Sequence, residues 1–290
     1  MGPALQDFGW HTFGKPLRCL VLFDTSAEPL QIPGMEAFQI VLLPCLADNY
    51  SVLLHDPVSG ETAAIDASDA ATIEAALTAR NWRLNHLFIT HHHTDHTAGI
   101  AELKGHYGAS VTGPEAEADR IPGLTRGVTE ATRLEFAGHP IRVLETPGHT
   151  LGHVTYYLPE DGLAFTGDTL FSLGCGRIFE GDPQMMWNSV SKIAALPDDT
   201  RIYCGHEYTL GNARFAMSVE PENDALKARV AEVEALRADG EPTLPTTIDL
   251  EKATNPFLRP QSRMVRARLG LDGAPDWKVF ARLRELKNKA

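Results

Sequence analysis

The densest group of chemically active side chains lies in residues 91–96, which read His-His-His-Thr-Asp-His. Imidazole and carboxylate groups are the ligands that borderline divalent metals prefer. Alternate residues of an extended segment point to the same side, so His91 and His93 are expected to face one metal while the histidine between them points away. Asp95 and His96 follow where the chain is expected to turn. They can therefore reach a second metal beside the first.

Three further candidate ligands, His149, Asp168 and His206, lie downstream, and each follows a short β-like run and a glycine. Open α/β layers place their sites at the carboxyl ends of strands, so these loops are expected to converge on one edge. Seven ligands suit two metal ions better than one. Zinc is expected, although His and Asp ligands also accept iron and manganese.

The remaining histidines lack such a context and are predicted to pack or to face solvent. His153, four residues after His149, is weighed as a residue that could orient a ligand rather than bind metal. The histidines predicted to be packing or surface residues are His11, His55, His86, His106 and His139.

Short strands must position these loops, and the hydrophobic pattern predicts them over 39–43, 51–54, 62–65, 86–89, 110–112, 141–144, 154–158, 163–165 and 202–204. Helices are expected over 70–80 and 98–107. Beyond Glu207 the pattern becomes helical, over 211–219, 221–239, 261–269 and 276–287, with a connecting loop over 241–260. Strands followed by helices suggest two parts.

Composition excludes several classes of protein. The 290 residues carry 38 acidic and 26 basic side chains, a formal charge of −12, which disfavours nucleic acid as a partner. No apolar stretch approaches the length that a bilayer requires, so no membrane span is expected. Four cysteines without C-x-x-C spacing favour a reducing compartment, and we expect a cytoplasmic monomer.

Residues 91–96, with the three downstream ligands, resemble the metallo-β-lactamase superfamily. More narrowly, the sequence resembles glyoxalase II, the hydroxyacylglutathione hydrolases. The supporting segments are Asp-Asn-Tyr at 48–50, Gly-Asp-Thr-Leu-Phe at 167–171, Cys-Gly-Arg at 175–177, Cys-Gly-His-Glu-Tyr-Thr at 204–209 and Asn-Pro-Phe-Leu-Arg at 255–259.

The resemblance implies an α/β (α+β) fold, an αββα sandwich with a C-terminal helical domain. It implies an N-terminal extension over 1–34, a metal-binding catalytic domain over 35–206 and a helical substrate-binding domain over 207–290. Metal one is then held by His91, His93 and His149, and metal two by Asp95, His96 and His206. Asp168 bridges the two ions, and Asp95 or Asp168 holds the attacking water.

The resemblance also implies a set of substrate-binding positions: Arg177, Phe179, Tyr208, Arg259 and Arg263. Two positions depart from the family pattern. Phe179 stands where a tyrosine is usual, so one hydroxyl contact to the substrate is expected to be missing. Thr94 replaces an aromatic residue often found between the third histidine and the aspartate, which changes the pocket wall but no ligand.

The expected activity is hydrolysis of S-D-lactoylglutathione and related S-2-hydroxyacylglutathione thioesters to glutathione and a 2-hydroxy acid, a step of methylglyoxal detoxification. Two cations lower the pKa of a shared water from about 15.7 towards 7 and so make hydroxide available at neutral pH. Three alternatives stay open at this point: a glutathione-persulfide dioxygenase with a single iron, a phosphodiesterase, and a metal-bearing scaffold without catalytic activity.

Overall fold

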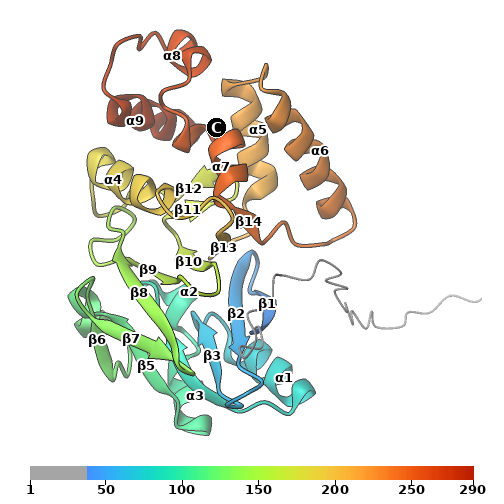
Figure 1. Ribbon diagram of the computed structural model, residues 1–290, viewed down its shortest axis with the longest axis vertical. Helices are drawn as coiled ribbons and strands as arrows, with labels where there is room; N and C mark the ends of the chain where they lie inside the picture. Colours follow the sequence, from blue (N-terminus) through green and yellow to red (C-terminus); the bar gives the residue numbers. More distant parts are fainter. Residues whose placement is uncertain (1–37) are drawn as a thin grey trace, which may run out of the picture. The chain divides into compact units, whose positions relative to one another are not determined.

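The computed structural model describes residues 38–290 (Figure 1). The predicted N-terminal extension, residues 1–34, lies outside the described residues. None of the helices in this part of the chain is long and apolar enough to cross a membrane.

The first sheet has six strands in sequence order. The first three strands are antiparallel, and the remaining pairs are parallel. The strands are β1 (Gln39–Cys45), β2 (Asn49–His55), β3 (Thr62–Ile65), β4 (Leu84–Phe88), β5 (Ser110–Pro114) and β6 (Arg126–Val128).

The second sheet also has six strands, in the order β14-β13-β10-β9-β8-β7, and only β10 and β13 pair in parallel. A two-stranded sheet of β11 (Leu170–Phe171) and β12 (Gly174–Cys175) follows β10 along the chain. The strands of the second sheet are β7 (Arg133–Phe136), β8 (His139–Glu145), β9 (Val154–Leu158), β10 (Leu163–Gly167), β13 (Arg201–Cys204) and β14 (Thr246–Thr247).

Helices cover the outer face of each sheet. The α-helices are α1 (Ala70–Arg80), α2 (Thr94–Thr97), α3 (Ile100–Tyr107), α4 (Pro183–Ala194), α5 (Thr209–Val219), α6 (Asp224–Ala238), α7 (Ile248–Thr254), α8 (Arg263–Leu269) and α9 (Asp276–Lys287). Two 3-10 helices, η1 (Glu115–Arg120) and η2 (Pro256–Leu258), complete the set.

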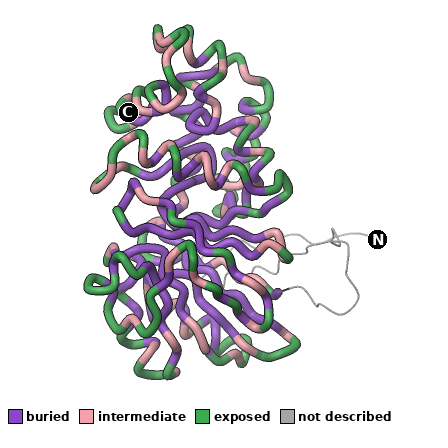
Figure 2. Tube along the Cα trace, turned by 60° about the vertical axis from the view of Figure 1, so that its left-hand side comes forward, coloured by how far each residue is buried: buried purple, intermediate pink, exposed green. Residues whose placement is uncertain are grey.

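The core forms three main layers, because each sheet buries apolar side chains on both faces. Between the sheets lie the rings of Phe88, Phe136, Tyr156 and Phe165. α1 and α3 cover the outer face of the first sheet, while α4 and the C-terminal helices cover that of the second. Buried segments run through both sheets and continue into the helical part (Figure 2). The predicted αββα arrangement with C-terminal helices is therefore confirmed.

The prediction of a connecting loop over 241–260 is wrong. This segment contains β14, α7 and η2. Its Pro and Thr residues act at the ends of these elements rather than preventing them. Pro256 opens η2, and the Asn255 side chain accepts a hydrogen bond from the backbone N–H of Phe257.

Local capping also explains one shifted boundary and one helix that the sequence did not predict. α6 begins at Asp224 instead of 221, because the side chain of Asn223 caps its first turn by accepting a hydrogen bond from Leu226. α4, which the hydrophobic pattern did not predict, has Asp182 as its N-cap and Pro183 at its first position.

Buried polar side chains of α7 and its C-cap attach the helical part to the β11–β12 sheet. Glu251 accepts a hydrogen bond from the backbone N–H of Leu173, and the amide of Asn255 donates to the carbonyls of Phe171 and Gly174. Asn255 is the first residue of the Asn-Pro-Phe segment. It supports the chain that directly follows Asp168. Whether the chain divides into two domains between residues 206 and 207 stays a prediction.

Candidate metal centre

All seven predicted metal ligands lie together where loops leave the two sheets. The loop after β4 carries the ligands of residues 91–96, and the loop after β8 carries His149. Asp168 directly follows β10, and His206 follows β13. The side chains form three overlapping groups whose ligand atoms lie within 4.8 Å of one another: His91, His93 and His149; His91, His96 and Asp168; and Asp95, His96 and His206.

The first three histidines present three ring nitrogens to one point. Nδ1 of His93 lies 3.0 Å from Nε2 of His91 and 3.0 Å from Nε2 of His149. His92 turns away, as predicted, and its ring meets Glu117 instead.

A second group lies beside the first. Nε2 of His96 and Nε2 of His206 are 3.3 Å apart, and Oδ2 of Asp95 lies 3.4 Å from His206 Nε2. Asp168 faces both groups: its Oδ2 lies 3.3 Å from Nε2 of His149 and 3.3 Å from Nε2 of His206. The carboxylate of Asp168 is therefore placed to share two cations.

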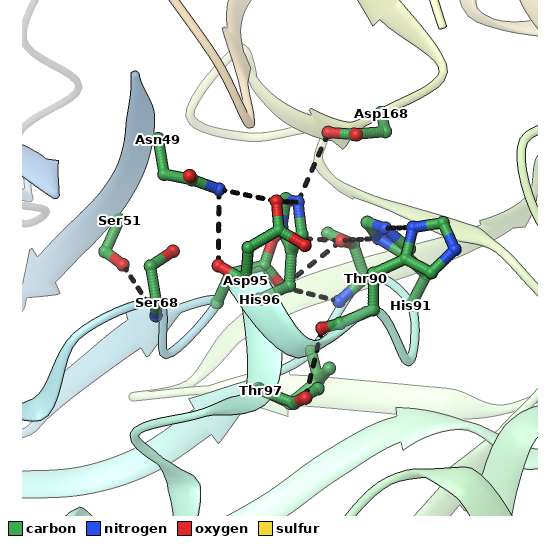
Figure 3. Close-up of polar contacts among 12 residues, drawn as sticks. Asn49, Ser51, Ser68, Thr90, His91, Asp95, His96, Thr97 and Asp168 are labelled. Carbon is green, nitrogen blue, oxygen red and sulfur yellow. Dashed lines mark hydrogen bonds and ion pairs between the residues drawn. The ribbon is translucent and has the colours of Figure 1, made fainter. Parts of the chain in front are cut away.

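In several ligand histidines, the ring nitrogen that points away from the ligand group contacts a neighbouring oxygen atom. This contact orients the ring. Nδ1 of His149 donates to the carbonyl of Arg177 at 2.8 Å, and Nδ1 of His206 lies 3.0 Å from Oδ1 of Asp48. Nδ1 of His96 lies 2.8 Å from Oδ2 of Asp66. Figure 3 shows His96 between Asp95 and Asp168, with Asn49 donating to Asp95 at 3.0 Å.

Thr90 determines the tautomer of His91. The backbone N–H and hydroxyl of Thr90 both donate to Asp66, at 2.8 and 2.9 Å. Because its hydroxyl proton is used there, Thr90 Oγ1 accepts from Nδ1 of His91, 3.0 Å away. Nε2 of His91 therefore carries a lone pair, as does Nε2 of His149, whose Nδ1 donates to a carbonyl.

Burial and neighbouring charges favour the metal-binding forms of four of the ligands, His91, His93, His149 and Asp168. Burial, followed by the surrounding imidazoles, holds the pKa of His91 well below its usual value, so the ring is neutral. Burial also lowers the pKa of His93 and His149. For Asp168, burial would raise the pKa, but His96, His206 and His149 outweigh it and lower the pKa strongly, so the carboxylate stays ionised.

The residues fit divalent cations on three grounds. First, Nδ1 of His93 lies 3.0 Å from Nε2 of His91 and 3.0 Å from Nε2 of His149, and of these three nitrogens at most that of His93 carries a proton. This spacing is close to the roughly 3.3 Å between two ligand nitrogens on tetrahedral zinc with bonds of about 2.0–2.1 Å. Oδ1 of Asp168 is buried and has no hydrogen-bond partner among the described residues. In addition, Asp168 and Asp66 overcome the effect of burial and raise the pKa of His96 to about 9. The site therefore favours positive charge.

His153 orients Asp168 rather than joining the ligand groups. Its Nε2 accepts a hydrogen bond from the backbone N–H of Asp168 at 3.0 Å, so the ring proton is on Nδ1. Nδ1 lies 3.0 Å from the hydroxyl of Thr146 and 3.1 Å from that of Thr169. His153 thus fixes the start of the loop that carries the shared carboxylate.

The other histidines lie away from the ligand groups. His55 stacks on Trp82, His139 pairs with Asp161, and His86 bonds to Ser110. His106 pairs with Glu74 at the surface, while His11 lies outside the described residues.

Three of the residues predicted to bind substrate lie beside the metal ligands. Tyr208 stacks on the ring of His206, with ring centroids 4.7 Å apart, and is 40% exposed. Phe179 is 60% exposed and packs edge-on against His149. The exposed guanidinium of Arg177 lies 6.0 Å from the Phe179 ring. These side chains form an accessible rim around the ligand groups.

Arg259 has an internal partner. Its guanidinium donates to both carboxylate oxygens of Glu220, at 2.8 and 3.0 Å, and to the carbonyl of Lys252. Arg263 is exposed at the first position of α8, and Thr94 is exposed at the start of α2. A substrate-binding role for Arg259 and Arg263 stays a prediction.

Two family models together match almost all of the described residues. The metallo-β-lactamase superfamily matches residues 46–206, and the C-terminus of hydroxyacylglutathione hydrolase matches residues 207–290. The "Hydroxyacylglutathione hydrolase" of Rhizobium meliloti strain 1021 is 56% identical over 254 residues, which cover 88% of this chain and 99% of the relative.

A second relative of the same name, from Brucella anthropi, is 54% identical over 88% of this chain and 97% of its own length. The chain belongs to the hydroxyacylglutathione hydrolases. Among solved structures, the BLEG-1 B3 metallo-β-lactamase matches with a TM-score of 0.59 and 21% identity over 76% of this chain and all of its own. That likeness shows the fold alone.

The sequence analysis did not predict the carboxylates that hydrogen-bond to the ligands. Asp66 directly follows β3, at the same edge of the sheet as the ligand loops, so its position was a usable signal. Asp48 and Asn49 lie in the quoted Asp-Asn-Tyr segment but received no role. Glu117 gave no signal, because it follows no motif and lies on a short 3-10 helix.

Replacing Asp66 by asparagine is expected to weaken divalent metal binding by about 10–100-fold, because such partners orient ligating imidazoles and raise their basicity. The amide oxygen cannot serve Thr90 and His96 as both carboxylate oxygens do. Competition with a chelator of known affinity measures the change. Asp56→Asn is the matched control, because this buried carboxylate accepts hydrogen bonds from the backbone amides of Val58 and Ser59 in its own turn. Equal affinities in the two variants would contradict the prediction.

Proposed function

We propose that this chain hydrolyses S-D-lactoylglutathione and related S-2-hydroxyacylglutathione thioesters with two divalent cations, most simply zinc. His91, His93 and His149 would hold one cation, and Asp95, His96 and His206 the other. The observation that carries the proposal is the carboxylate of Asp168, which lies 3.3 Å from Nε2 of His149 in the first group and of His206 in the second.

Two bound cations supply Lewis-acid chemistry, lowering the pKa of a water towards neutrality and polarising a thioester carbonyl. The chain's own residues orient the attacking water and accept its hydrogen bond. Asp95 is half-buried at the open side of the group, where Asn49 fixes its Oδ2. Its carboxylate can accept a hydrogen bond from the attacking water.

The reaction needs no general acid. A carbon–oxygen bond forms to the acyl carbon, the carbon–sulfur bond breaks, and the electron pair leaves on the sulfur. Because a thiol has a pKa near 8.5, the thiolate is a good leaving group that takes a proton from solvent.

The exposed rim supports recognition of a glutathione thioester. Arg177 offers a cation for a substrate carboxylate, and Tyr208 places a hydroxyl next to His206. Phe179 occupies the position expected to carry a hydroxyl, so one polar contact is missing there. We further propose that residues 207–290 act as a substrate-binding domain in a cytoplasmic monomer that has no nucleic-acid partner.

The direct test is hydrolysis of S-D-lactoylglutathione by the purified full chain, followed as loss of thioester absorbance, with metal content measured on the same sample. We expect turnover that depends on about two bound metal ions per chain. Metal-loaded protein that leaves the thioester intact would overturn the proposal.

A mononuclear-iron glutathione-persulfide dioxygenase is not favoured, because the hydroxyacylglutathione hydrolase C-terminus matches residues 207–290. Oxygen uptake with glutathione persulfide separates the two activities. The proposal requires no uptake by the protein that hydrolyses lactoylglutathione.

A further inference from the structure

A buried carboxylate outside the ligand groups joins two of the loops that carry ligands. Glu117 lies on η1 and is only 3% exposed. Its backbone departs from helical geometry, with φ −118° and ψ 15°, inside an otherwise 3-10 segment. The side chain is thereby inserted between the loop after β4 and the loop after β8.

Each carboxylate oxygen of Glu117 serves a different loop. Oε2 accepts from the backbone N–H of His92 at 2.7 Å and from the ring Nδ1 of the same residue at 2.8 Å. Oε1 accepts from the backbone N–H of Gly152 at 3.0 Å. His92 lies between His91 and His93 in the chain, and Gly152 is three residues after His149.

The close approach of Glu117 requires a glycine at position 152. A Cβ atom added to Gly152 would lie 2.4 Å from Cγ of Glu117, nearer than side chains can pack. A second carboxylate supports the same loop. Glu180 accepts from the backbone N–H of Leu151 at 2.9 Å and from Arg120, another residue of η1, at 2.7 Å.

We propose that Glu117 is a positioning residue that sets the distance between His149 and the pair His91 and His93. The inference rests on the proposed metal-dependent function. In the metal-free protein, the lone pairs of the three ring nitrogens repel one another, because at most one of these nitrogens carries a proton. A rigid connection between the two loops keeps them converged, so the cation meets a ready-made group and less binding energy is lost in ordering the loops.

The test uses Glu117→Gln in the full chain. Glutamine has only one acceptor oxygen, so it can hold the His92 loop or the Gly152 loop but not both. We expect the affinity of the group formed by His91, His93 and His149 for Zn²⁺ to fall by about 10–100-fold in chelator competition, the range typical of partners behind metal ligands. Glu115→Gln, an exposed glutamate on the same 3-10 helix, is expected to leave Zn²⁺ affinity unchanged.

Cobalt substitution supplies a readout that a loss of general stability would not change. The visible absorption of Co²⁺ depends on the geometry of its ligands, so Glu117→Gln is expected to change the spectrum of one of two bound ions. Glu115→Gln is expected to keep the wild-type spectrum. If Glu117→Gln does not fold, Glu117→Asp takes its place, since the shorter side chain keeps the charge but cannot reach both loops.

The outcomes separate this inference from the proposed function. Wild-type protein that binds no Zn²⁺ overturns the proposed function itself. Wild-type protein that binds two ions, with a folded Glu117 variant of the same affinity and the same Co²⁺ spectrum, overturns only the role of Glu117. Weaker Zn²⁺ binding and a changed spectrum, confined to the Glu117 variants, support it.

Discussion

Replacing Asp168 by alanine is expected to lower the turnover of S-D-lactoylglutathione by roughly 10²–10³-fold or more, the loss that follows removal of one preorganised electrostatic group. The same change is expected to reduce bound metal below two ions per chain. Turnover and metal content are measured on one preparation, the first by thioester absorbance and the second by elemental analysis.

The size of this effect follows from the position of Asp168. Its Oδ2 lies equally far from a histidine of each ligand group, and its Oδ1 is buried without a hydrogen-bond partner among the described residues. Alanine therefore removes the negative charge that two cations would share. Their mutual repulsion then opposes binding of the second ion.

Asp161→Ala is the matched control for Asp168→Ala. Asp161 is a partly buried aspartate just before the opposite end of β10, and it pairs with His139 at 3.0 Å. We expect near wild-type turnover and full metal content from it. Wild-type protein stripped by a chelator gives the activity floor. An Asp168→Ala protein that keeps full rate at full metal content would show that the carboxylate is not shared.

The ligand set could be predicted because its signal is local. Each ligand follows a strand-like run, and strands that end at the same sheet edge bring their loops together whatever the intervening chain does. The alternation in residues 91–93 also placed His92 on the opposite side, where it meets Glu117. Neither inference needed long-range packing.

The residues behind the ligands could not be predicted in the same way, because their partners are far away in sequence. Asp66 bonds to a ring 30 residues downstream, and Glu117 accepts from a glycine 35 residues away. Hydrogen-bond partners of this kind depend on how the sheets and η1 pack, and no period or motif encodes that. Such a residue can be predicted from the sequence only where it directly follows a strand, as Asp66 does.

In the C-terminal part, the sequence pointed to the right residues but predicted the wrong local structure. The Asn-Pro-Phe-Leu-Arg segment supports the family resemblance, and the sequence predicts a loop around it. Asn255 instead caps η2 and supports the β11–β12 sheet. Arg259, at the end of the same segment, pairs with the buried carboxylate of Glu220.

Arg259→Ala is expected to lower the free energy of unfolding by about 3 kcal/mol, because it leaves Glu220 buried without its partner. Glu220 has a side chain that is 4% exposed, and that of Arg259 is 27% exposed, so the lower end of the range for buried pairs applies. Denaturant unfolding measures the change. Lys227→Ala, which breaks the exposed pair with Asp224, is expected to leave the stability close to that of wild type.

The pH dependence identifies the cause of this loss. Burial would raise the pKa of Glu220, but hydrogen bonds from Arg259, Ser262 and Asn223 outweigh it and hold the pKa below its usual value. A lowered carboxyl pKa stabilises the fold above the unfolded value of about 4.3, and this contribution is lost as the pH falls through the folded pKa. The difference between wild type and Arg259→Ala is therefore expected to be largest near neutral pH and to narrow below about pH 4.

A double variant separates the internal ion pair from the substrate role that the sequence suggested. Adding Glu220→Gln to Arg259→Ala removes the unpaired charge, so the double variant is expected to be more stable than Arg259→Ala alone. If Arg259 acts through this ion pair, the KM of the folded double variant for S-D-lactoylglutathione stays near that of wild type. A KM that rises at least about tenfold without loss of stability would instead assign Arg259 to the substrate.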